Sequence, residues 1–123
     1  MMMRMEVAAP RECSLRTLNG CYGFTFSGTI VGVGPIAGIG VINYDGQGRA
    51  TLNQTLNING SGGIRDTVTA TYTVNPDCSG SEVVTQTDGS LTHIDFVIDD
   101  HGKELLTLPT DPGSVITGTA KKQ

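Results

Sequence analysis

The sequence predicts an all-β protein, and specifically an eight-stranded antiparallel barrel with up-and-down connections. Composition is the first reason: the 123 residues include 17 glycines and many threonines, residue types that favour tight turns and strands. The second reason is that apolar residues recur with a period of two, and no ten-residue window has the period of an amphipathic helix. Third, Gly, Pro, Asn and Asp separate these alternating segments at short intervals, as in antiparallel proteins.

The first three strands are predicted at residues 20–27, 36–44 and 49–58. In the first, three aromatic residues alternate with small or polar ones: Tyr22, Phe24 and Phe26. The second follows a glycine-rich stretch that ends at Pro35. It is joined to the third by Asp45-Gly46-Gln47-Gly48, a strong hairpin signal because glycine accepts the positive φ of such turns.

The fourth strand, residues 67–74, has the clearest alternation. One face carries apolar residues from Val68 to Val74, including Tyr72, and threonines at 67, 69, 71 and 73 form the other face. Asn75-Pro76 begins the turn that ends it, since Pro and Gly interrupt strands. The remaining strands are predicted at residues 82–87, 90–98, 104–108 and 115–120.

Eight short strands with tight turns favour a closed barrel over a sandwich. Closure removes sheet edges, which otherwise promote aggregation. An immunoglobulin-like β-sandwich is the alternative, but it usually contains a buried Trp, and this chain has no Trp. We expect residues 1–15 to form a flexible arm and residues 16–123 a single barrel domain. The interior of such a barrel is either filled by side chains or wide enough for one small ligand.

Charge and hydropathy exclude several partners. The net charge is −4, and the only adjacent basic residues are Lys121 and Lys122, so a nucleic-acid surface is disfavoured. No apolar run reaches the roughly 18 residues of a membrane helix, so we expect no membrane insertion. The first ten residues also lack the apolar stretch of a secretory signal. That leaves two expectations, a cytosolic chain or one separated from its leader.

Three cysteines, Cys13, Cys21 and Cys78, have no metal-binding spacing. We therefore expect no metal and no cofactor. One pair can form a disulfide and leave one thiol over; the alternative is three reduced thiols packed as small apolar residues.

The only candidate catalytic pair is His93 and Asp95, which share one face of the strand at 90–98. If that face lines the lumen, the carboxylate could orient the imidazole for acid–base chemistry. The opposite orientation turns Ile94, Phe96 and Ile98 inward and leaves His93 and Asp95 in solvent. No G-x-S-x-G nucleophile motif is present.

Aromatic residues are the best candidates for ligand binding. If they face a partly open lumen, they form an apolar pocket with a few hydroxyl groups that orient a ligand; plain core packing is the alternative. The candidates are Tyr22, Phe24, Phe26, Tyr44, Tyr72 and Phe96.

Four segments resemble small, largely uncharacterised secreted bacterial proteins similar in architecture to calycin-type barrels, which include the allene oxide cyclase and lipocalin folds. The segments are residues 13–28, 44–48, 72–80 and 110–113, and the likeness spans about residues 13–120. It implies a barrel fold and an exported, secreted or periplasmic origin, and it supplies no catalytic residues.

The resemblance also implies a disulfide between Cys13, before the first strand, and Cys78, after the Asn75-Pro76-Asp77 turn. Such a bridge would fix the N-terminal arm to the barrel and stabilise it by about 2–4 kcal/mol in an oxidising compartment. Cys21 departs from the pattern of the group and is expected to be free.

Three functions follow from these expectations. The first is a non-enzymatic barrel that binds a small apolar or amphipathic ligand in its lumen. The second is a cyclase or isomerase that uses the same cavity. The third is a structural or self-assembling extracellular protein, a homo-oligomer whose barrel is filled.

Overall fold

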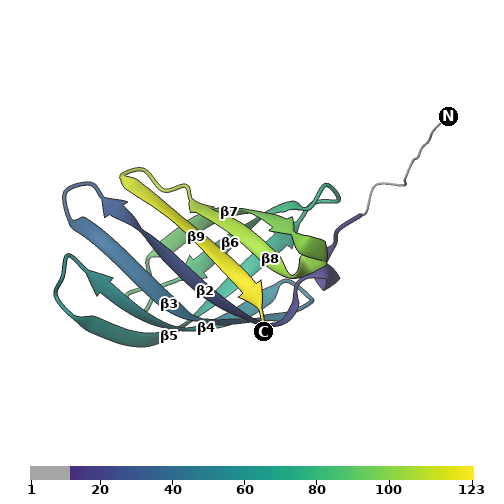
Figure 1. Ribbon diagram of the computed structural model, residues 1–123, viewed down its shortest axis with the longest axis horizontal. Helices are drawn as coiled ribbons and strands as arrows, with labels where there is room; N and C mark the ends of the chain where they lie inside the picture. Colours follow the sequence, from purple (N-terminus) through teal and green to yellow (C-terminus); the bar gives the residue numbers. More distant parts are fainter. Residues whose placement is uncertain (1–11) are drawn as a thin grey trace.

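Eight strands form one closed antiparallel barrel in the computed structural model, which describes residues 12–123 (Figure 1). The strands are β2 (Asn19–Ile30), β3 (Gly34–Asp45), β4 (Arg49–Ile58), β5 (Gly63–Val74), β6 (Ser79–Thr85), β7 (Leu91–Asp99), β8 (Glu104–Pro109) and β9 (Ser114–Lys122). Each strand pairs with the next in the chain, and β9 pairs back with β2, so every strand has two neighbours. The structure thus confirms the predicted fold class and rules out the sandwich.

Strand bounds differ from the prediction mainly at three strands. β2 ends at Ile30 instead of residue 27, and β6 spans Ser79–Thr85 instead of residues 82–87. At β5, which begins at Gly63 instead of residue 67, the difference bears on the lumen. The first residues of β5 extend the ladder with β4, where Leu56 pairs with Ile64 and Gln54 with Asp66. Backbone pairing therefore continues through a stretch whose charged residues, Arg65 and Asp66, interrupt the apolar alternation. The consequence is that Asp66 joins the inner face of the barrel.

The two ends of the barrel are built differently. At the end that we call the mouth lie the turns at residues 31–33, 59–62, 86–90 and 110–113. At the closed end lie the other turns, together with two single-turn 3-10 helices, η1 (Leu15–Thr17) and η2 (Asp100–Gly102). In the part of the chain that the structure describes, no helix is long and apolar enough to cross a bilayer.

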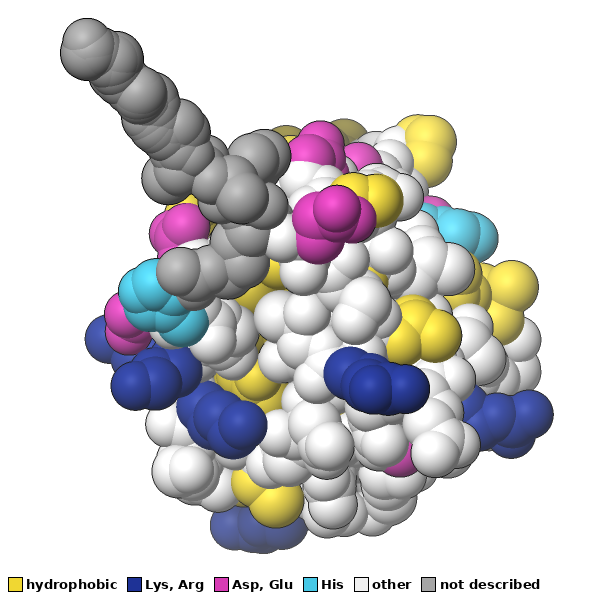
Figure 2. All heavy atoms as spheres, turned by 90° about the vertical axis from the view of Figure 1, so that its right-hand side faces the viewer, with side chains coloured by type: hydrophobic (Ala, Val, Ile, Leu, Met, Phe, Trp, Pro, Cys, Tyr) yellow, Lys and Arg dark blue, Asp and Glu magenta, His cyan; other side chains and the backbone are white. Residues whose placement is uncertain are grey.

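The closed end is sealed by the N-terminal segment, residues 12–18. Cys13 forms a disulfide with Cys78 across 65 residues of sequence, with the two Cα atoms 5.0 Å apart, which confirms the expected bridge. The Cys13 N–H donates to the Pro76 carbonyl at 3.1 Å, and Leu18 is fully buried. Seen from this end, atoms of the described residues cover the middle of the barrel (Figure 2).

Part of the expected flexible arm is thus packed against the barrel. Residues 1–11 of that arm lie outside the described residues. Cys21 is free and exposed on the outer face of β2, as expected.

Candidate functional site

The lumen contains a cavity of about 750 Å³ that extends to the mouth. All eight strands contribute to its lining, and so do the mouth residues Asp88, Asp111 and Pro112. Its walls are mainly apolar: Phe24, Phe26, Ile42, Leu52, Leu56, Val84, Ile94 and Ile116. A volume of this size lies within the range of small-molecule sites.

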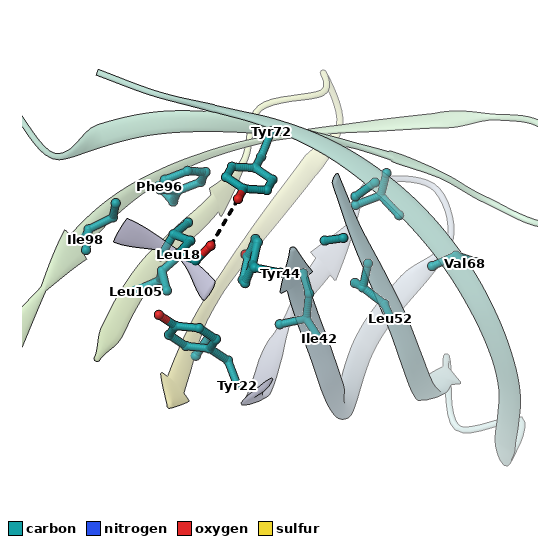
Figure 3. Packing of buried hydrophobic residues seen from close by; sticks show 14 of the residues in the cluster. Leu18, Tyr22, Ile42, Tyr44, Leu52, Val68, Tyr72, Phe96, Ile98 and Leu105 are labelled. Atoms are coloured by element: carbon teal, nitrogen blue, oxygen red, sulfur yellow. Dashed lines mark hydrogen bonds between the residues drawn. The ribbon is translucent and has the colours of Figure 1, made fainter. Parts of the chain in front are cut away.

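The floor of the cavity, at the side of the closed end, is formed by Tyr44 and rests on a group of tyrosines that also includes the buried Tyr22 and Tyr72. The Tyr44 ring contacts the other two edge to face, with centroid distances of 5.3 Å to Tyr22 and 5.0 Å to Tyr72. Such arrangements are favoured by the ring quadrupoles. Beneath the rings, Leu18 lies near Tyr72 and Leu105 (Figure 3).

Hydroxyl groups tie this floor to the segments that seal the barrel. The Tyr72 hydroxyl lies 3.0 Å from the Leu15 carbonyl oxygen and 3.1 Å from that of Leu18 (Figure 3). The Tyr22 hydroxyl donates to the Gly102 carbonyl in η2. These buried hydroxyls are satisfied by the backbone, so they hold the closed end in place.

Tyr44 differs because its hydroxyl is bonded to a carboxyl group of the lumen. It donates to Oε1 of Glu82 on β6 at 2.7 Å. Glu82 is only 6% exposed. Burial raises its pKa to about 7, although the hydrogen bond from Tyr44 acts in the opposite direction. The pKa of Tyr44 is raised as well, by burial and by the neighbouring carboxylate. A carboxyl with this pKa can bind or release a proton near neutral pH.

A second polar pair lies nearer the mouth. Gln54 on β4 donates from Nε2 to Oδ1 of Asp66 on β5 at 2.9 Å, and both side chains line the cavity. Gln54 is 8% exposed. The cavity is therefore mainly apolar, with these two polar pairs on its floor and wall and further polar side chains at its mouth, including Asp88 and Asp111.

The lumen stays open because phenylalanines face glycines on the neighbouring strand. Phe24 pairs with Gly40 and Phe26 with Gly38 in the β2–β3 ladder. A Cβ atom at Gly38 would lie 2.3 Å from Cζ of Phe26, and one at Gly40 would lie 2.9 Å from Cζ of Phe24. The rings thus lie over glycine backbone, against the wall of the barrel instead of across it.

The six predicted ligand-binding aromatics divide into two groups. Phe24, Phe26 and Tyr44 line the cavity. Tyr22, Tyr72 and Phe96 belong to the buried cluster at the closed end. The structure therefore brings all six to the inner side of the barrel, with only the first three on the cavity surface.

His93 and Asp95 do not face the lumen. Ile94, Phe96 and Ile98 point inward on β7, so the alternative orientation described above is the one adopted. The side chain of His93 is 51% exposed, and its Nδ1 lies 2.8 Å from Oδ1 of Asp111 instead of bonding to Asp95. The hydrogen bonds from His93 lower the pKa of Asp111. The acid–base pair of His93 and Asp95 required the opposite orientation of β7, so these two residues do not form it in the lumen.

Sequence reasoning missed Glu82, Gln54 and Asp66 as lumen residues. Each lies on the inward face of its strand. Gln54 is two residues from both Leu52 and Leu56, and Glu82 is two residues before Val84, so they share the face of these apolar residues. A polar residue in the apolar phase of an alternating strand is the signal that could have identified them.

Within residues 12–123, no group of three or more His, Cys, Asp or Glu side chains is arranged to hold a metal ion. The chemistry that the lumen offers is hydrogen bonding and proton binding by Glu82 and Tyr44, surrounded by apolar walls.

The fold and the cavity define a class of protein, a closed eight-stranded up-and-down barrel with a single-mouthed lumen. No protein-family model matches the sequence, and no curated protein is similar to it. Among solved structures, the chain is similar to a de novo designed fluorescence-activating β-barrel, with a TM-score of 0.65 and 11% identity over 89% of this chain and 96% of that one. At this identity the likeness shows a shared fold alone.

Proposed function

We propose that this protein binds a small apolar or amphipathic molecule in its lumen. The observation that carries the proposal is the cavity of about 750 Å³, whose walls are mainly aliphatic and aromatic and which reaches the mouth. Burial of apolar ligand surface in such a site drives binding. The third expected function, a structural barrel with a filled interior, does not fit a cavity of this size.

The similar fold of the designed barrel supports this proposal. That protein is a β-barrel designed to be fluorescence-activating. We also propose that the protein is related to the calycin-type barrels of exported bacterial proteins. This relationship is supported by the up-and-down topology and by the Cys13–Cys78 disulfide, because disulfides persist in oxidising compartments.

The experiment that tests the proposal is titration with Nile red, a neutral dye that fluoresces in apolar surroundings. We expect one dye to bind each native molecule. The variant Ile94→Trp fills the cavity from β7 and should weaken dye binding by about tenfold or more. Because the chain has no Trp, the new indole also reports energy transfer to the dye.

The matched control is Ile39→Trp, which adds the same side chain on the outer face of β3, where Ile39 is 63% exposed. Dye affinity should be unchanged in this variant. Absence of uptake by the native protein, or equal binding by both variants, would contradict a lumen site.

A further inference from the structure

All ionisable side chains that line the lumen, apart from the Tyr44 hydroxyl, are acidic. Its lining includes four carboxyl groups, and no Lys, Arg or His is among the described residues that form it: the carboxyls belong to Asp66, Glu82, Asp88 and Asp111. Of these, Asp88 and Asp111 lie at the mouth, Asp66 on the wall and Glu82 at the floor.

Basic side chains of the described residues lie mostly at the opposite end. Those at the closed end are Arg16, Arg49, Lys103, Lys121 and Lys122, and Lys and Arg side chains lie around this end in Figure 2. The exceptions are Arg65, which is exposed on β5, and His93 on β7, whose Nδ1 lies outside the lumen, 2.8 Å from Oδ1 of Asp111. The electrostatic field inside the cavity therefore favours a cation, and the low polarity of the walls reduces its screening.

Glu82 gives this field a specific acceptor. The Tyr44 hydroxyl occupies Oε1, and Oε2 accepts no hydrogen bond from a residue in the described range of 12–123. A buried carboxylate oxygen without a donor costs free energy that a ligand N–H can recover. The Tyr44 oxygen, which donates its proton to Glu82, also keeps lone pairs with which it can accept a hydrogen bond.

We infer that the lumen is a site for an apolar amine, whose protonated nitrogen binds the Glu82 carboxylate and the Tyr44 oxygen at the floor while its apolar body contacts the walls. This inference rests on the proposed lumen binding and names the chemical class of the ligand. Phe24, Phe26 and Leu52 supply apolar surface above the acidic floor, so head and body are recognised by different parts of one cavity.

Three naphthyl probes of similar shape test the head group: naphthylmethylamine, naphthylmethanol and naphthoate. Each competes with Nile red for the native protein at pH 8, above the pKa of Glu82 of about 7. A charge-assisted hydrogen bond should make the amine bind about tenfold more tightly than the alcohol, and naphthoate should bind most weakly.

The variant Glu82→Gln keeps the shape of the side chain and removes its charge. It should reduce the preference for the amine over the alcohol to less than about threefold while the alcohol binds as before. The matched control is Asp88→Asn, which removes one negative charge at the mouth and should reduce the preference by a smaller factor than Glu82→Gln does. Folding of both variants is checked by Nile red binding.

The outcomes separate the two proposals. If the alcohol binds as tightly as the amine, or if Glu82→Gln and Asp88→Asn reduce the amine preference equally, the inference about Glu82 is wrong while lumen binding stands. If neither the dye nor any probe binds, the proposed function itself fails.

Discussion

At the scale of single residues, Glu82 is the group whose surroundings depart most from those of an ordinary side chain of its type. Its position on β6 directs it into the lumen, next to Tyr72 on one neighbouring strand and Ile94 on the other. A carboxyl buried in this way favours its protonated form. The same residue therefore gives the lumen a potential binding group and gives the fold a dependence on pH.

Stability should fall as the pH rises through this group. The pKa of Glu82 in the folded state, about 7, lies above the ordinary value of 4.5, so between these values the folded state binds more protons than the unfolded state. Its contribution is fully present below pH 4.5 and is lost by about pH 7, a change of about 3 kcal/mol. Urea denaturation at pH 5 and pH 8 measures it.

The variant Glu82→Gln should not show this decrease, since it has no proton to lose. Four carboxyls in turns affect stability in a different, more acidic pH range: Asp45, Asp77, Asp88 and Asp111. Hydrogen bonds lower their pKa values, donated by His93 to Asp111 and by residues of the same turn to the other three. Their contribution is present above the ordinary value of 3.8 and is lost in stronger acid. Equal slopes for the native protein and Glu82→Gln between pH 5 and 8 would show that Glu82 is not buried as described.

At the scale of the elements, the β2–β3 ladder determines how much of the lumen is free. Inward phenylalanines on β2 oppose inward glycines on β3, and the ring of Phe26 occupies the place that a side chain at Gly38 would need. The volume of the cavity thus depends on the residues of both strands, because each phenylalanine of β2 needs a glycine opposite it on β3.

The variant Gly38→Ala should push the Phe26 ring toward the lumen. We expect a loss of about 1–3 kcal/mol of stability from overpacking, together with weaker Nile red binding. The control is Gly23→Ala on the same strand as Phe26, because a Cβ there meets only the Gln123 side chain, at 3.7 Å. Chemical denaturation and dye titration of both variants provide the comparison, and unchanged dye affinity in Gly38→Ala would count against the steric account.

The strands themselves were largely predictable, and the site was predictable only in part. Period-two alternation identified all eight strands because each has one face toward the core, and it placed Phe24, Phe26 and Tyr44 on the inner side. Glu82 and Asp66 were missed because alternation is recognised by its apolar members, so a carboxyl in the same phase interrupts the pattern. The orientation of β7 was ambiguous because His93 and Asp95 share a face with apolar Leu91 and Val97.

At the scale of the whole molecule, the disulfide joins the N-terminal segment to the β5–β6 turn. The bridge closes a long loop and restricts the unfolded chain, and it holds Leu18 against the barrel at the same time. Hydrogen bonds between the first and last strands, β2 and β9, close the barrel itself. The disulfide therefore acts on the N-terminal segment, which it fixes to the closed end.

Removal of the bridge by the double variant Cys13→Ser/Cys78→Ser should lower the free energy of unfolding by about 2–4 kcal/mol. Reduction of the native protein should have a similar effect. Cys21→Ser, which changes the exposed free thiol, serves as the control and should stay within about 0.5 kcal/mol of the native protein. Guanidinium denaturation measures the difference, and equal stability of the three proteins would refute a stabilising role.

Residue 12 and Gln123, the first and last described residues, both lie at the sealed end: Cys13 is bonded to the β5–β6 turn, and the Gln123 N–H donates to Cys21 at the start of β2. A neighbouring domain, an affinity tag or a solid support joined through either position would therefore hold the molecule by its base, with its entrance facing outward. Immobilised in this way, the barrel should bind Nile red with the same affinity as the free protein, because its mouth stays accessible.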